Sequence, residues 1–196
     1  MSIKRGAGII PFALSGGQIH FLFHKTFSGR RAGLLVDFGG GSLSGETQHQ
    51  TAAREFVEET EAMFLNDHPE DANLSLHAES QIQVVLNLLQ NTQRNHPDWW
   101  CQRLNVKGKK PKEWKTFFVE VEYKTLNRMN RLWEVNPQQL FKKRRELIWL
   151  TSDRLLDICI NQPEKLWTRV RELDNAVSVI RSIEINSISS TSTTVC

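Results

Sequence analysis

The chain has 196 residues, of which 39% are hydrophobic and 24% charged, as is typical of a single globular domain. Its formal net charge of +3 is too small to indicate a nucleic-acid partner. Its apolar runs are shorter than the roughly 18 residues of a transmembrane helix, so no membrane partner is expected. The three cysteines, Cys101, Cys159 and Cys196, show no CxxC spacing, and they favour reduced thiols in a cytoplasmic protein over a disulfide scaffold.

The first predicted elements are two strands that form a hairpin. Residues 5–14 are rich in apolar residues but too short for a signal peptide, and Pro11 within them suggests an edge strand or a bulge. A Ser-Gly-Gly turn signal separates them from a second strand at residues 18–27. His20 and His24 would share one face of this strand, and with no third ligand in view we interpret them as ordinary strand histidines.

A basic loop follows the hairpin. Within residues 28–32, Arg30 and Arg31 are candidates to bind a substrate phosphate, and a solvated loop is the alternative. Residues 33–38 then predict a third strand. We expect the glycines that follow it, Gly39, Gly40 and Gly41, to form a turn, because glycine adopts backbone angles closed to other residues.

An acidic cluster comes next and is the strongest candidate for a functional site. Residues 48–64 predict a helix with Glu55, Glu58 and Glu59 on one face and apolar side chains on the other. Like charges at this spacing cost roughly 0.2–0.5 kcal/mol per pair. Mg²⁺ or Mn²⁺ would turn that repulsion into coordination, because both ions prefer oxygen ligands. A solvated acidic face without a metal is the alternative.

The spacing of these residues resembles the Nudix box. The pattern is Gly, five residues, Glu, seven residues, then Arg-Glu-apolar-any-Glu-Glu, and it is matched by Gly40, Glu46, Arg54, Glu55, Phe56, Glu58 and Glu59. One position departs, because Glu61 stands where the box has a glycine. A non-glycine residue with positive φ costs about 1 kcal/mol. Either the helix therefore continues past Thr60, or the turn after it differs.

The second half of the chain predicts further helices and strands. They are a helix at 74–93, strands at 102–107 and 113–123 with the latter central, an irregular basic loop at 124–143, a last strand at 144–150, a short helix at 153–160 capped by Thr151 or Ser152, and a final helix from 164 to about 184 that Pro163 opens. Four tryptophans are candidates for stacking on a nucleobase, with core packing as the alternative: Trp99, Trp100, Trp114 and Trp133.

The resemblance implies a fold class and a domain plan. It implies the Nudix fold, an α/β architecture in which a mixed β-sheet is sandwiched between helices. Residues 1–185 would form one Nudix hydrolase domain, with a helical insertion at 66–98. The insertion could form a lid, support a homodimer or cover the sheet. Residues 186–196 have the composition of a disordered tail.

The resemblance also implies an activity. It is the hydrolysis of a pyrophosphate bond in a nucleoside diphosphate derivative, a small-molecule substrate, with Mg²⁺ or Mn²⁺ as cofactor. Aromatic and basic loops favour a nucleotide sugar or ADP-ribose. By the match to the box, the metal ligands would be the carboxylates of Glu55, Glu58 and Glu59 and the carbonyl of Gly39, with Arg54 and Glu46 orienting them. Glu146, before the last strand, is a candidate catalytic base, and the alternative pairs it with Arg144 or Arg145.

Two alternatives to an enzyme remain. A non-catalytic Nudix-fold module that binds nucleotides or regulates a partner would be expected to lose box glutamates, and none is lost here. A coincidental helix in an unrelated metal-binding protein would lack the strands on either side of the box.

Overall fold

The computed structural model describes residues 4–70, 74–103, 112–139, 141 and 143–191. Within these residues, six strands form one sheet in the order β4-β5-β1-β2-β6, with β3 paired to β1. The strands are β1 (Lys4–Ser15), β2 (Gln18–Thr26), β3 (Phe38–Gly41), β4 (Trp100–Gln102), β5 (Lys112–Glu120) and β6 (Arg145–Thr151). Only β1 and β5 pair in parallel among these strands. The α/β class and the mixed sheet predicted from the sequence are confirmed.

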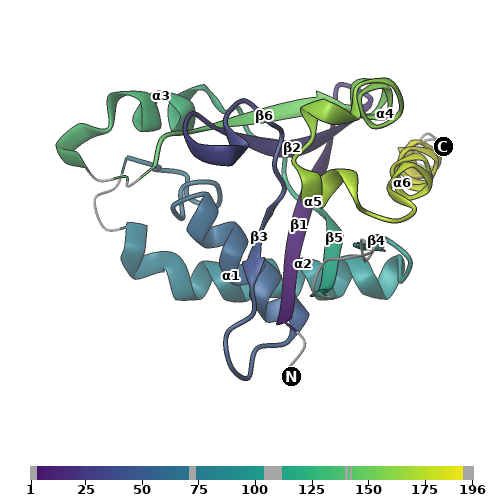
Figure 1. Ribbon diagram of the computed structural model, residues 1–196, viewed down its shortest axis with the longest axis horizontal. Coiled ribbons are helices and arrows are strands. Elements are labelled where there is room, and N and C mark those ends of the chain that lie inside the picture. Colours follow the sequence, from purple (N-terminus) through teal and green to yellow (C-terminus); the bar gives the residue numbers. More distant parts are fainter. Residues whose placement is uncertain (1–3, 71–73, 104–111, 140, 142, 192–196) are drawn as a thin grey trace.

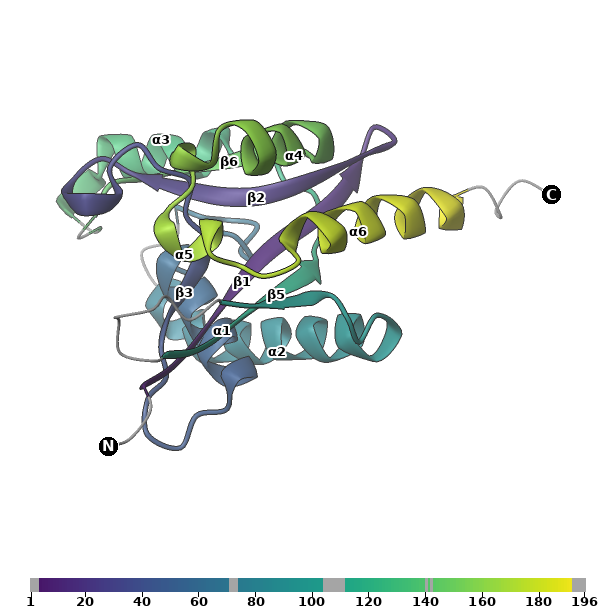
Figure 2. The ribbon, with the colours of Figure 1, turned by 45° about the vertical axis from the view of Figure 1, so that its right-hand side comes forward.

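Helices cover both faces of the sheet. One group is α1 (Gln48–Glu59), α2 (Ala78–Asn95) and α3 (Asn127–Val135), and the other is α4 (Ser152–Asn161), α5 (Thr168–Arg171) and α6 (Ala176–Thr191). Figure 1 shows α1 and α2 below the strands and α4 and α6 at the right, and Figure 2 gives a second view. Short 3₁₀ turns complete the chain at Gly29–Arg31, Leu74–His77, Pro137–Gln139 and Pro163–Lys165. Each group of helices buries its own apolar cluster against the sheet.

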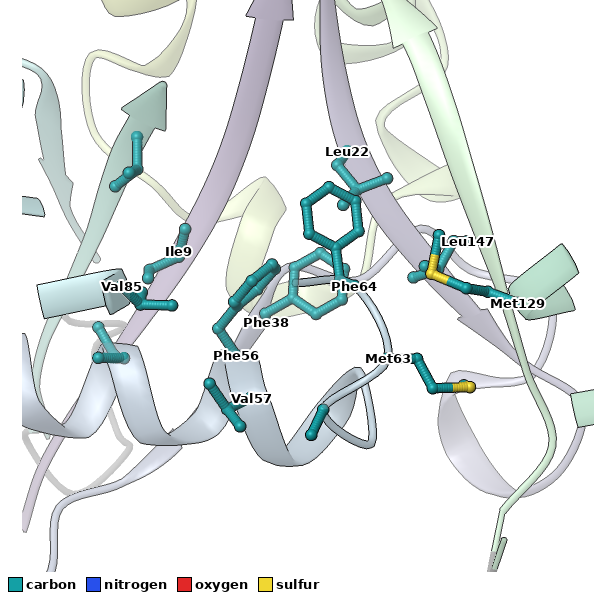
Figure 3. Packing of buried hydrophobic residues seen from close by; sticks show 14 of the residues in the cluster. Ile9, Leu22, Phe38, Phe56, Val57, Met63, Phe64, Val85, Met129 and Leu147 are labelled. Carbon is teal, nitrogen blue, oxygen red and sulfur yellow. The ribbon is translucent and has the colours of Figure 1, made fainter. Parts of the chain in front are cut away.

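Phenylalanines fix α1 to the sheet. Phe56 of α1 packs edge-on against Phe38 of β3, with ring centroids 5.0 Å apart, and against Phe64, at 5.5 Å (Figure 3). Such pairs contribute about 0.5–1.5 kcal/mol each beyond the burial of their area. The apolar face of α1 is thereby held against β3, which sets the position of its carboxylates.

The first strand is central, so the prediction of an edge strand was wrong. β1 pairs with β5 along one side and with β3 and β2 along the other. On that second side, residues 6–9 pair with β3 and residues 12–15 pair with β2. Pro11 lies between these two stretches, where β1 changes partner. A proline without an N–H is tolerated there because no ladder bond is lost on that side.

Several predicted boundaries were also wrong. The box helix ends at Glu59 instead of residue 64, and the third strand begins at Phe38 instead of residue 33. The loop predicted at 124–143 contains α3, whose Met129 and Trp133 are buried one turn apart. The final helix is broken into a 3₁₀ turn, α5 and α6. α6 continues to Thr191, through part of the predicted tail, and residues 192–196 lie outside the described residues, as does most of the strand predicted at 102–107.

The segment predicted as an insertion packs beside α1. Its helix α2 contacts both α1 and β5, and buries Val85 and Leu89. The Gln81 Nε2 donates a hydrogen bond of 2.9 Å to the carbonyl of Ala62, in the turn that follows α1. α2 therefore extends the cover of the sheet and supports the exit of the box helix. Among the described helices, none combines the length and apolar character needed to cross a bilayer.

Candidate active site

The three box glycines form strand β3, not the turn predicted from the sequence. Gly39 and Gly40 pair with Gly8 and Ala7 of β1. A Cβ atom on Gly39 would lie 2.5 Å from the carbonyl oxygen of Ala7 and from the Cα atom of Gly8. A Cβ atom on Gly40 would overlap the carboxylate of Glu55. These positions therefore need glycine for space, and their backbone angles are those of an ordinary strand.

Helix α1 begins with a capping box. The side chain of Thr47 accepts a hydrogen bond from the backbone N–H of Gln50, and the Gln50 side chain accepts one from the N–H of Thr47. These bonds satisfy two of the free N–H groups at the helix start. Glu46 lies directly before the cap, so its carboxylate is placed beside the first turn of the helix.

Arg54 joins the box carboxylates into one network. Its Nε and Nη2 donate to the two oxygens of Glu46, at 2.7 and 3.1 Å. Its Nη1 donates to Glu55 at 2.9 Å and to Glu58 at 3.1 Å, while Nη2 also reaches the carbonyl of Gly41 at 2.9 Å. Hydrogen bonding from Arg54 lowers the pKa of Glu46 to about 2. Arg54 thus pairs with Glu46 and contacts Glu55 and Glu58, and the role of Arg54 and Glu46 in orienting metal ligands stays a prediction.

Glu59 is the most buried of the box carboxylates. Its Oε2 accepts a 2.8 Å hydrogen bond from the backbone N–H of Gly39. Its Oε1 lies 3.9 Å from the guanidinium nitrogens of Arg31 and Arg145, beyond hydrogen-bond range. Burial raises the pKa of Glu59 to about 7, although Arg169 and Arg145 oppose the shift. A buried carboxylate without a close counter-charge would gain from a bound cation.

A buried ion pair that the sequence analysis missed holds β3 from the other side. The Arg169 Nε donates to Asp37 at 2.8 Å, and its Nη1 donates to the carbonyl of Gly39, also at 2.8 Å. The guanidinium lies over the ring of Trp114, 4.3 Å from its centroid. Gly39 is therefore fixed at both ends, since its N–H binds Glu59. The positive charge of Arg169 beside the Gly39 carbonyl disfavours the metal-ligand role that we predicted for this oxygen.

The alternation of side chains along β6 places Arg145, and not Glu146, on the face of the sheet that α1 covers. Leu147 belongs to the apolar cluster under α1, whereas Ile148 belongs to the cluster under α4 and α6. Side chains alternate along a strand, so Arg145 shares the face of Leu147, and Glu146 points to the opposite face. Glu146 is therefore directed away from the box carboxylates, which disfavours its predicted role as catalytic base. The alternation could have indicated Arg145 from the sequence.

The turn after α1 forms without the glycine of the box. Glu61 adopts a left-handed conformation, with φ of 51°. The N–H of Ala62 donates to the carbonyl of Val57 at 2.8 Å, and the N–H of Glu61 donates to that of Glu58 at 3.2 Å. This is the hydrogen-bond pattern of a Schellman motif. The Glu61 carboxylate lies 3.3 Å from Arg145. The helix therefore does not continue past Thr60, and Glu61 takes the left-handed position at which the box has a glycine.

The basic loop and the tryptophans differ in how close they come to the site. Arg31 lies near Glu59 and over the ring of Trp167, 5.3 Å from its centroid, whereas Arg30 is exposed. Three of the four candidate tryptophans, Trp99, Trp114 and Trp133, are buried in the core. Trp100 is half-buried, with the Lys115 ammonium 4.1 Å from its ring centroid. Core packing is the better account of the first three.

The donor set suits a hard divalent cation, although the side chains point elsewhere in this structure. Across the described ranges, no group of three or more His, Cys, Asp or Glu side chains is arranged to hold a metal ion. Glu55 and Glu58 face Arg54, and Glu59 faces the N–H of Gly39. All three come from one helix and offer carboxylate oxygens, which Mg²⁺ and Mn²⁺ prefer. The Glu58 side chain is 56% exposed and so has room to turn.

Comparisons with known proteins find a partial sequence match and several similar folds. No protein-family model matches the chain. The uncharacterized protein L534 of Acanthamoeba polyphaga mimivirus is 43% identical over 63 residues, which span 31% of this chain and only 20% of that protein. The fold is similar to a C. elegans Ap4A hydrolase in a binary complex, with a TM-score of 0.48, 16% identity and coverage of 96% of this chain and 99% of the other. It is also similar to the Nudix hydrolase RenU of M. smegmatis, with a TM-score of 0.44, 16% identity and coverage of 93% and 85%. At these identities and scores, the case for a function rests on the site residues.

Proposed function

We propose that this chain is a Nudix-type hydrolase that cleaves a pyrophosphate bond in a nucleoside diphosphate derivative, with the help of Mg²⁺ or Mn²⁺. The observation that carries the proposal is the network around Arg54, which gathers Glu46, Glu55 and Glu58 against the glycine strand. Carboxylates this close repel one another. A helix surface shaped only by stability would therefore separate them unless a group such as Arg54 held them together.

The roles of the side chains follow from their contacts. Glu55, Glu58 and Glu59 would hold the cations, and Arg54 and Glu46 position them without touching substrate. Glu55 fits because Gly40 leaves space for its carboxylate, and Glu59 fits because it is buried without a counter-charge in hydrogen-bond range. Bound divalent ions would neutralise the charge of the pyrophosphate and lower the pKa of a water molecule. Since Glu146 faces away, we propose that a box carboxylate accepts the proton of the attacking water.

The test is formation of a nucleoside monophosphate, resolved by chromatography, from a panel of nucleotide sugars, ADP-ribose, dinucleotide polyphosphates and nucleoside triphosphates. Each is assayed with Mg²⁺, with Mn²⁺ and with EDTA. Glu59→Gln keeps an oxygen that can accept from the N–H of Gly39 but removes the charge, and we expect it to lower turnover by about 10²-fold or more. Glu120→Gln is the matched control, because Glu120 is an exposed glutamate on β5.

The outcomes separate the two main alternatives. Metal-dependent turnover that Glu59→Gln abolishes and Glu120→Gln preserves would support the hydrolase and identify its substrate. Absence of turnover across the panel, together with saturable nucleotide binding, would replace it with the non-catalytic binding module.

A further inference from the structure

Three side chains on neighbouring strands carry buried polar atoms that lack a hydrogen-bond partner among the described residues. They are the Thr26 Oγ1, the Arg145 Nε and both ring nitrogens of His24. Thr26 and Arg145 are directly opposite in the register of β2 and β6, and His24 is opposite Leu147. Native proteins pair nearly all buried polar atoms, so a cluster of unpaired ones indicates water or a ligand. The cluster lies on the face of the sheet that α1 covers.

The cluster is cationic and has hydrogen-bond donors to spare. The side chain of Arg145 is only 9% exposed, and Glu61 holds its Nη1 at 3.3 Å. Arg145 and Arg31 both form long ion pairs with Glu59, at 3.9 Å, beyond hydrogen-bond range. Burial, followed by the charges of Arg145, Arg169 and Arg31, lowers the pKa of His24 well below its usual range. A neutral imidazole therefore adds one N–H donor and no charge.

A cavity adjoins Arg145, the member of the cluster that lines it. It has a volume of about 530 Å³, and its walls include Phe27, three arginines (Arg131, Arg144 and Arg145) and two glutamates (Glu134 and Glu146). The Phe27 ring is 50% exposed, and the Arg144 guanidinium lies 4.2 Å from its centroid. Small-molecule sites occupy roughly 300–1,000 Å³. A group bound at Arg145 can therefore continue into space large enough for the rest of a nucleotide.

We propose that Arg145 and Thr26, with His24 beside them, form a phosphate-binding subsite next to the box carboxylates. The inference rests on the proposed function for the identity of the ligand, a phosphate group of the substrate. Phosphate oxygens only accept hydrogen bonds, and the cluster offers the Arg145 Nε–H, the Thr26 hydroxyl and a ring N–H. Water is the alternative occupant of the cluster, and the experiment below distinguishes the two. Glu61 acts as a positioning residue, because it orients Arg145 from the turn after α1.

The experiment measures binding without catalysis. Methylenebisphosphonate, a pyrophosphate analogue that cannot be hydrolysed, is titrated calorimetrically into the full-length protein in EDTA. Glu59→Gln serves as the parent, since it removes the negative charge beside the subsite. We expect saturable binding to this parent. Adding Thr26→Val should weaken the affinity about fivefold, the effect of one neutral hydrogen bond. Adding Arg145→Lys should weaken it about tenfold or more, because the guanidinium fork is lost while the charge stays.

Two control variants and one stability measurement distinguish a lost contact from a lost fold. Thr125→Val and Arg154→Lys make the same chemical changes at exposed positions and should leave the affinity unchanged. Thr26→Val removes a hydroxyl that has no partner, so its unfolding midpoint should stay the same or rise. Weaker binding by a fully folded Thr26→Val variant would therefore support a direct contact.

The proposal is overturned by an absence of saturable binding to the Glu59→Gln parent. It is equally overturned if both Thr26→Val and Arg145→Lys keep the parent affinity, which would make the cluster a water site. Because no metal or turnover is involved, the result is independent of the proposed hydrolysis. Binding without hydrolysis would retain the subsite and reject the enzyme, and hydrolysis without this binding would do the reverse.

Discussion

Adding a methyl group to each of the three glycines of β3 in turn should distinguish effects on stability from effects on turnover. Gly39→Ala puts its Cβ atom 2.5 Å from backbone atoms of β1, which cannot move without breaking the strand pairing. Gly40→Ala puts its Cβ atom into the Glu55 carboxylate, the flexible end of a side chain. Gly41→Ala meets nothing within 4 Å. The same substitution therefore tests a backbone contact, a functional contact and open space.

The expected magnitudes differ accordingly. Overpacking costs about 1–3 kcal/mol, and more where the neighbour cannot yield, so Gly39→Ala should lose about 3 kcal/mol or more of unfolding free energy. Gly40→Ala should lose about 1–2 kcal/mol, because Glu55 can swing away and forfeits mainly its bond to Arg54. Gly41→Ala should stay within about 0.5 kcal/mol of the wild type.

Turnover should follow a different order from stability. Displacing Glu55 by about 1 Å or more should lower kcat about 10²-fold in Gly40→Ala, even at a temperature where the variant is fully folded. Urea unfolding followed by circular dichroism gives the stabilities, and formation of the nucleoside monophosphate gives the turnover. The reasoning fails if Gly40→Ala keeps wild-type turnover, or if it is as unstable as Gly39→Ala.

Three further predictions concern buried charge and backbone strain. In EDTA, raising the pH from about 4.5 to 7 should remove up to about 3 kcal/mol of stability through Glu59, because its folded pKa of about 7 lies above its unfolded value of 4.5. Urea unfolding at pH 5 and pH 8 should show this loss in the wild type relative to Glu59→Gln, and equal losses in both would contradict it. Glu61→Gly should be about 1 kcal/mol more stable than Glu61→Ala, because only glycine relieves the left-handed φ, and identical unfolding midpoints would argue against strain. Arg169→Met should cost about 3–5 kcal/mol by leaving Asp37 buried without its cation, and adding Asp37→Asn should recover part of it; a loss below 1 kcal/mol in thermal or urea unfolding would show that the pair does not hold β3.

The sequence predicted the local parts of the site well. The helical spacing of Glu55, Glu58 and Glu59 and the pairing of Arg54 with Glu46 depend on residues within one turn or one short loop of each other. Local periodicity is sufficient for such relations. The same holds for the hairpin of β1 and β2 and for the Thr151 cap of α4, which the structure confirms.

The contacts missed by the sequence analysis join distant parts of the chain. Arg169 meets Gly39 across 130 positions, and Arg145 meets Glu61 across 84. Nothing in the local pattern around Arg169 marks it as buried, because it lies in a stretch that resembles one long amphipathic helix. Arg169 lies in the short helix α5, and its side chain bonds Asp37 and Gly39. Arg145 could have been predicted from the sequence, because side-chain alternation along β6 places it on the face of the sheet that α1 covers.

The balance of charge around the box suggests the order in which ligands bind. Carboxylates outnumber guanidiniums in the site, which contains Asp37, Glu46, Glu55, Glu58, Glu59 and Glu61 beside Arg31, Arg54, Arg145 and Arg169. Two of the arginines, Arg54 and Arg169, are saturated by protein oxygens and so serve the architecture. The other two, Arg31 and Arg145, form only long ion pairs with Glu59, at 3.9 Å, and the buried Nε of Arg145 has no partner among the described residues. Cations drawn to the surplus of carboxylates would remove the repulsion that Glu59 exerts on an anion, and a phosphate would then bind these two arginines more tightly. By linkage, the bound phosphate would tighten the hold on the cations by the same factor, so a bisphosphonate should lower the Mn²⁺ concentration needed to saturate the site.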